Sequence, residues 1–293
     1  MSGRFDHIVE VGSARYDYLE EVAKGNPYHD PKTGRFTTGP GGAGSFSPAG
    51  TIAEAREYAK TALGFSGRVD YSYSYIDQQE GRQVSGTLDI ATVNHINKSI
   101  TEIQARYPEL KGYVQNLECT DSRVYAQLHH DGRDATPSLR IGAKVYKDGV
   151  ESVYRKYAED VDLGYHPKGT TGDAILWHEY GHVYASMANE KACGSNATAR
   201  AKLDAIRLDV AESGWKDAAV KKMMGDSSLK QEHDMLGLDF SAQSVAESFG
   251  KHISRYATSN NAELFAEAFA AHNTGTKTKW TDALMEAAGA RRN

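Results

Sequence analysis

The stretch that decides how this chain folds is Ala174-Ile175-Leu176-Trp177-His178-Glu179-Tyr180-Gly181-His182-Val183-Tyr184. Apolar residues surround two histidines in it, a pattern that predicts a largely buried helix. Good capping residues at 170–173 predict where the helix begins, and we expect it to end around Asn189. Because residues four positions apart share one face of a helix, His178 and His182 point the same way.

The two histidines and the glutamate after the first form an H-E-x-x-H motif. Neutral imidazole nitrogens suit zinc, and Glu179 is placed to accept a proton from a water molecule that the metal binds. The motif therefore predicts a Zn²⁺ site with His178 and His182 as ligands and Glu179 as the general base of a hydrolytic reaction. Because the motif is short, a chance pair of surface histidines is an alternative that stays open.

A hydrolytic zinc site takes three protein ligands and leaves a fourth position open. Downstream, Asn260 is a typical helix N-cap, and apolar residues recur on one face of the following segment as far as Phe269. Glu263 and Glu267 lie four positions apart on this helix. The first can be the third ligand, while the second can accept an N–H from a ligating histidine. Tyr256 precedes the helix and can donate a hydrogen bond to an oxyanion as it forms.

Simpler interpretations of these residues stay open. Glu263 follows Asn260 by three positions, so it can be the glutamate of a capping box, and Glu267 is then the next candidate ligand. Tyr256 is one of 17 tyrosines, and a packing role explains it equally well. Four other histidines are expected to be solvated and not to bind metal: His166, His233, His252 and His272.

Together, the motifs at His178–His182 and Tyr256–Phe269 resemble the catalytic domain of anthrax lethal factor and related gluzincin metallopeptidases. The segment Gly164–Thr170 also resembles a lead-in common in such zincins. The resemblance implies a zincin-like fold of the α+β class and a zinc metalloendopeptidase activity. It assigns the zinc ligands His178, His182 and Glu263, the general base Glu179, the transition-state stabiliser Tyr256, and Glu267 as support for a ligand. The gap of 81 positions between the second and third ligands is long for this family, and a helical insertion over about 190–250 accounts for it.

The rest of the chain predicts a small mixed sheet ahead of the active-site helix and a mostly helical C-terminal half. Helices are expected at 51–65, 88–107, 198–223 and 240–256, and strands at 69–76, 112–114, 124–128 and 139–146. We expect the last strand to be an edge strand that lines the cleft, where an extended peptide can dock by adding a strand. This is why a peptide or protein is the expected substrate.

Composition excludes several classes of protein. The hydrophobic content of 40% and charged content of 25% are those of a soluble globular chain. A net charge of −5 gives no electrostatic footprint for nucleic acid, and no run is long and apolar enough for a membrane. The start of the sequence lacks the apolar core of a signal peptide, and two cysteines fit synthesis in a reducing cytoplasm. The expected location is the bacterial host cytoplasm or a phage virion.

The expectation of a virion location rests on the segment Asn26-Pro27-Tyr28-His29-Asp30-Pro31-Lys32-Thr33-Gly34-Arg35-Phe36. Its Pro and Gly content predicts a linker or exposed loop, so we divide the chain into 1–50, an N-terminal helix with a Gly/Pro-rich linker or tail, and 51–293, the catalytic domain. The segment also resembles one that recurs in head-associated proteins of tailed bacteriophages. That resemblance implies a phage-encoded, virion-associated or maturation protease with phage head proteins as partners. Two alternatives stay open: a non-catalytic head or virion structural protein, and a host-directed toxin or effector protease.

Overall fold

The structure, a computed structural model, describes residues 46–129, 137–193, 210–275 and 277–291. One compact unit, Pro48–Asn293, holds all the helices and strands given below. The expected N-terminal helix, the Gly/Pro-rich linker and the phage-like segment at 26–36 lie outside the described residues, as does the first part of the helix expected at 198–223.

Helix α2 (Ile52–Thr61) precedes the first strand, and helix α3 (Ile90–Arg106) lies in the chain between the third and fourth strands. Helix α2 begins at a capping box that Thr51 and Glu54 form, and α3 begins at the N-cap Asp89. Each helix buries its apolar side in the common core, and α2 packs against α3. The expected helices at 51–65 and 88–107 are therefore present, each a few residues shorter.

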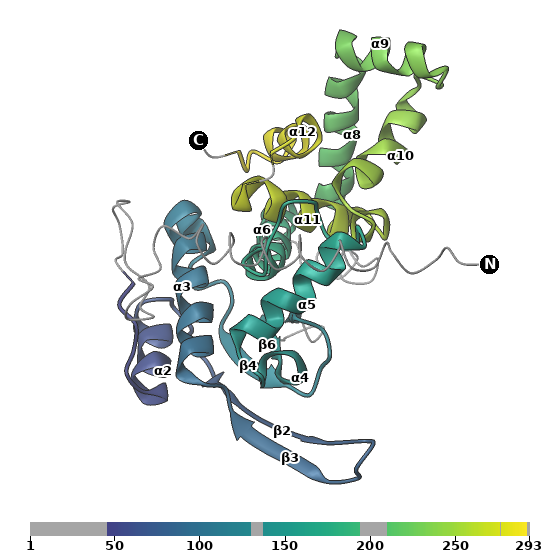
Figure 1. Cartoon of the computed structure of the whole chain (residues 1–293). Coiled ribbons are helices and arrows are strands. Elements are labelled where there is room, and N and C mark those ends of the chain that lie inside the picture. Colours follow the sequence, from purple (N-terminus) through teal and green to yellow (C-terminus); the bar gives the residue numbers. More distant parts are fainter. Residues whose placement is uncertain (1–45, 130–136, 194–209, 276, 292–293) are drawn as a thin grey trace, which may run out of the picture. The chain divides into compact units, whose positions relative to one another are not determined.

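A four-stranded mixed sheet has the order β1-β4-β6-β5. Its strands are β1 (Val69–Asp70), β4 (Asn116–Thr120), β6 (Ser138–Gly142) and β5 (Ala126–His129). The first three run parallel, whereas β5 is antiparallel to β6. A separate antiparallel hairpin, β2 (Ser72–Ile76) with β3 (Gln83–Thr87), projects from this region (Figure 1). A small mixed sheet together with many helices confirms the α+β class.

The edge strand expected at 139–146 is wrong in two respects. Strand β6 ends at Gly142, where the chain turns into the short helix α4 (Ala143–Tyr146), and β6 lies between β4 and β5. Four of its five residues are buried, as is typical of an internal strand, while β5 has only one buried residue, Ala126. The two edges of this sheet are β1 and β5, and β5 is the edge that packs against helix α6 (Ala174–Cys193).

Two other expected strands differ from the structure. Residues 112–114 do not form a strand: Gly112 has a φ of +79°, in the left-handed region, and β4 begins only at Asn116. The strand expected at 69–76 divides at the buried Tyr71, so its halves belong to different sheets. The described elements that the sequence did not predict are β3, α4, α5 (Val150–Asp162), α9 (Ser227–Leu236), α12 (Lys279–Ala287) and the short 3-10 helices Pro108–Leu110 and Tyr256–Thr258.

The C-terminal half is helical and is built around α6 (Ala174–Cys193), which ends four residues beyond the expected Asn189. Helix α6 packs against β5 and α3, and most extensively against α11 (Asn261–Thr274). Helix α12 covers α8 (Val210–Met224) and α11, and α10 (Ala242–Ile253) lies against α8 (Figure 1). In the range of about 190–250, where we expect an insertion, the described residues include α8, α9 and most of α10. No helix in the described ranges is long and apolar enough to cross a membrane.

Candidate metal centre

Helices α6 and α11 pack closely against each other at Gly181. A Cβ atom at this position would lie 2.9 Å from the Cα of Ala266 and 3.2 Å from the Cβ of Phe269. Glycine thus removes the atom that would hold the two helices apart. The close approach brings side chains that are distant in sequence onto one shared site.

Three side chains converge beside this crossing: His178 and His182 from α6, and Glu263 from the first turn of α11. One ligand atom from each lies within 4.8 Å of the others. The two Nε2 atoms are 3.2 Å apart, and Glu263 Oε2 lies 3.1 Å from His178 Nε2 and 3.5 Å from His182 Nε2. The N-cap Asn260 accepts the backbone N–H of Glu263, whose carboxylate faces the histidines. We name these three residues the metal cluster.

The electrostatics of the metal cluster favour a cation. Glu263 Oε2 is buried, and neither nearby imidazole nitrogen has the direction of a hydrogen bond to it. Burial raises the pKa of Glu263, but its contacts with His178 and His182 outweigh burial and hold the pKa well below its usual range. Burial lowers the pKa of His178, but its contacts with Glu263 and Glu267 raise it to about 10. Two imidazole nitrogens and a carboxylate oxygen are a donor set that fits zinc, which would take the place of the His178 proton.

Glu267 lies one turn further along α11 than Glu263 and contacts the Nδ1 side of the His178 ring. Its Oε1 is 2.8 Å from His178 Nδ1 and 3.2 Å from His166 Nδ1, and its Oε2 accepts a hydrogen bond of 2.7 Å from the Ser254 hydroxyl. Burial raises the pKa of Glu267, but the hydrogen bonds with His166 and His178 lower it to about 2. Glu267 therefore stays ionised and binds the Nδ1 side of the His178 ring, so that His178 Nε2 faces His182 and Glu263.

The expectation that His166 is solvated is wrong. Its side chain is buried, its ring stacks on Tyr157 with centroids 4.5 Å apart, and it contacts Glu267 as described. His233 and His272 are also buried, whereas His252 is exposed and stacks on an aromatic ring. His166 was missed because a histidine before a proline gives no sign of burial; the only signal was the resemblance of its segment to a zincin lead-in.

The same lead-in segment fixes Tyr256. The backbone N–H of Tyr256 donates to the carbonyl of Tyr165 at 3.0 Å, and the two rings stack with centroids 5.1 Å apart. The Tyr256 ring also lies over His178, with centroids 5.7 Å apart and planes 19° from parallel. Burial, followed by the charge of Glu263, raises the pKa of Tyr256, so the phenol stays protonated at neutral pH.

The side chain of Glu179 points toward strand β5. Its Oε2 accepts a hydrogen bond of 2.6 Å from the backbone N–H of Leu128. The backbone N–H of Gly142, the last residue of β6, donates a hydrogen bond to the carbonyl of Tyr125, which directly precedes β5. Because hydrogen-bonded and non-hydrogen-bonded residues alternate along an antiparallel pair, the backbone N–H and C=O groups of Ala126 and Leu128 point away from β6. Glu179 therefore connects the helix that carries the two histidines to the open edge of the sheet.

The structure thus brings together all the residues that the sequence singles out: His178, Glu179, His182, Tyr256, Glu263 and Glu267. Sequence reasoning missed Ser254 and the backbone of Leu128, neither of which carries a sequence signal. Comparisons of the chain with models of known protein families, with curated proteins and with solved structures found no match.

Proposed function

We propose that this protein is a zinc-dependent metalloendopeptidase with a zincin-like fold of the gluzincin type. The observation that carries the proposal is the convergence of His178, His182 and Glu263 within 4.8 Å, on two helices beside a sheet edge. Three protein ligands leave one position for water or substrate, which is typical of catalytic and not of structural zinc sites.

The residues around the metal cluster supply the other parts of a hydrolytic site. Zinc bound there would lower the pKa of a water molecule and polarise a carbonyl oxygen. Glu179 accepts the proton of the water and passes it to the leaving amine, while its bond to Leu128 fixes the carboxylate in relation to β5. Tyr256 donates a hydrogen bond to the oxygen on which negative charge develops. Glu267 keeps the ring of His178 in the orientation that binding requires.

Peptide is the substrate class that the edge of β5 favours. The outward backbone groups of Ala126 and the carbonyl of Leu128 lie next to Glu179, and no described strand pairs with them. An extended peptide can add to this edge by backbone hydrogen bonds. Its scissile carbonyl would then lie beside the metal cluster. Sugars and nucleotides have no matching row of backbone donors and acceptors.

The biological setting rests on sequence alone. The resemblance of residues 26–36 to a phage head-associated segment supports a phage-encoded maturation protease that acts on head proteins, in the virion or in the host cytoplasm. The position of Glu179 opposes the non-catalytic alternative, since a structural zinc site needs no general base.

The test compares the wild type with Glu179→Gln, and uses Glu247→Gln, an exposed glutamate on α10, as the control. We expect the zinc-loaded wild type and the control to hydrolyse fluorescein-labelled casein. A chelator should abolish and added zinc should restore this activity. Glu179→Gln should keep its zinc but lose turnover by about 10²- to 10⁴-fold, because only proton transfer is removed. Activity that survives Glu179→Gln, or a zinc-loaded wild type that cleaves neither casein nor a randomised peptide library, would contradict the proposal.

A further inference from the structure

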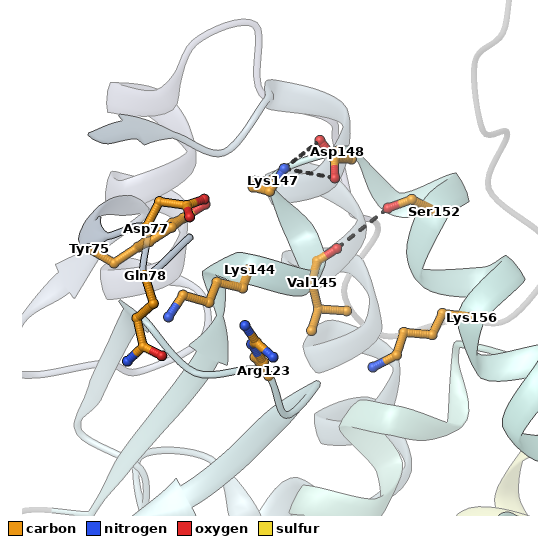
Figure 2. A pocket seen from close by; sticks show the side chains of 10 residues that line it. All are labelled: Tyr75, Asp77, Gln78, Arg123, Lys144, Val145, Lys147, Asp148, Ser152 and Lys156. Atoms are coloured by element: carbon orange, nitrogen blue, oxygen red, sulfur yellow. Dashed lines mark hydrogen bonds and ion pairs between the residues drawn. The ribbon is translucent and has the colours of Figure 1, made fainter. Parts of the chain in front are cut away.

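A hollow with a volume of about 430 Å³ lies outside the metal centre. The turn after β2, the loop before β5, and the helices α4 and α5 line it (Figure 2). We name it the basic pocket after the four cationic residues in its lining: Arg123, Lys144, Lys147 and Lys156.

The charges in the basic pocket are not balanced. Its lining has two acidic residues: Asp148 is 3.0 Å from Lys147 Nζ, and Asp77 accepts backbone N–H groups within its own turn. Outside the lining, the exposed Asp121 lies 3.7 Å from Lys144 Nζ. Within the described part of the chain, no carboxylate forms an ion pair with Arg123 or Lys156. Figure 2 shows the Arg123 guanidinium between the side-chain ends of Lys144 and Lys156. Positive charge thus gathers locally on a chain whose net charge is −5.

The basic pocket continues from the strand on which we place the substrate. Arg123 stands three residues before Ala126, the first residue of β5. Lys156 Nζ lies 4.7 Å from the ring centroid of Tyr125, and this ring is 6.1 Å from the ring of His166 at the metal centre. A peptide that follows β5 past Ala126 therefore reaches the basic pocket.

The lining of the basic pocket fits a peptide with carboxylates better than a nucleotide. The aromatic residue among the described lining residues, Tyr75, is buried, and Lys144 Nζ covers its ring at 4.8 Å, so no face is left to stack a base. The cations come from three parts of the chain: the loop before β5, α4 with its C-cap Lys147, and α5. This distribution suits several carboxylates along an extended chain. The exposed side chains of Val124 and Ile76, beside lining residues in sequence, supply the apolar contacts that a peptide also makes.

We propose that the basic pocket binds an acidic segment of the peptide substrate and so selects proteins with clustered Asp and Glu residues beside the cleavage site. The proposal rests on the metallopeptidase function for its biological meaning, but the binding itself needs neither zinc nor turnover. It is therefore tested apart from catalysis.

The binding test uses a short fluorescein-labelled peptide in which Asp and Glu alternate with Gly, and a matched peptide with Asn and Gln in their place. Fluorescence anisotropy is measured on the full-length Glu179→Gln protein. We expect the acidic peptide to bind about tenfold more tightly than the amide peptide at low salt, and the difference to shrink as salt is added. Arg123→Gln/Lys156→Gln should lose this preference.

The control is Arg155→Gln/Lys221→Gln, which removes the same charge from two exposed positions outside the pocket lining, one of them next to Lys156 on α5. The control should keep the preference, and thermal unfolding should show that both double variants are folded. Equal binding of the two peptides, or a preference that survives Arg123→Gln/Lys156→Gln, would overturn the proposal. A preference that follows the pocket residues in a protein without zinc-dependent hydrolysis would support the pocket and refute the metallopeptidase function.

Discussion

At the scale of single residues, His166 shows how the metal centre is supported from outside its ligand set. Its Nδ1 lies 3.2 Å from Glu267 Oε1, and the same oxygen lies 2.8 Å from His178 Nδ1. The loop before α6 therefore holds the carboxylate that orients a histidine of the metal cluster. Such partners of metal ligands typically change metal affinity by about 10- to 100-fold when they are removed.

Replacing His166 tests this support. His166→Phe keeps an aromatic ring to pack on Tyr157 but removes the contact with Glu267. We expect the affinity for zinc to fall by about tenfold, as measured by competition with a chromophoric chelator. The control is His252→Phe, a histidine that stacks on Trp280 and does not contact the cluster. Unchanged zinc affinity in His166→Phe would show that Glu267 does not need this partner.

At the scale of elements, the crossing of α6 and α11 decides whether the metal cluster forms. Glycine has a low helix propensity, and alanine at an open helical position is more stable by up to about 1 kcal/mol. At Gly181 the backbone of Ala266 is too close for a methyl group, since the added Cβ would lie 2.9 Å from its Cα. Helix propensity alone predicts that Gly181→Ala stabilises the protein, whereas packing against Ala266 should make this substitution destabilising.

Two glycine substitutions separate these effects. We expect Gly181→Ala to destabilise the protein by about 1–3 kcal/mol, because the helices must separate, and to weaken zinc binding. Gly214→Ala in α8 is the matched change, as nothing lies within 4 Å of the added Cβ, and it should leave stability unchanged or raise it by up to about 1 kcal/mol. Chemical denaturation measures both. A Gly181→Ala protein as stable as Gly214→Ala would contradict the close crossing.

The elements also show what sequence can and cannot predict here. The spacing of His178 and His182 is local to one helix, so the motif predicts their common face. The partnership with Glu263 depends on the crossing at Gly181, which no local pattern reveals, and the sequence left Glu267 open as an alternative. The edge strand was misplaced because strand order is a long-range property: β5 follows β4 in the chain, but β6 inserts between them. The basic pocket draws on four separate segments and has no sequence signature.

At the scale of the whole molecule, buried neutral histidines connect folding to pH. His272 on α11 is buried, its Nδ1 lies 3.0 Å from Asp282 Oδ1 on α12, and its Nε2 has no hydrogen-bond partner among the described residues. Burial, followed by the charge of Lys277, lowers the pKa of His272 from 6.5 despite the neighbouring Asp282. His95 on α3 is partly exposed, and its pKa is also lowered, chiefly by loss of contact with solvent.

A lowered pKa means that the unfolded chain takes up a proton more readily than the folded one. The contribution of His272 to the free energy of unfolding should therefore be greatest above about pH 6.5 and should fall as the pH drops below that value. We expect His272→Gln to reduce the slope of this decline, measured by urea denaturation at a series of pH values. The stability of each protein at pH 8 serves as its own reference. An unchanged slope would show that His272 does not contribute.

If residues from two helices form one three-ligand zinc site, the zinc content of the purified protein must depend on Glu263. Wild type, Glu263→Ala and the control Glu247→Ala are dialysed briefly against a weak chelator and measured by elemental analysis. We predict about one zinc per chain in the wild type and the control, and near none in Glu263→Ala. A wild type without zinc, or a Glu263→Ala protein that retains as much zinc as the wild type, would contradict the account.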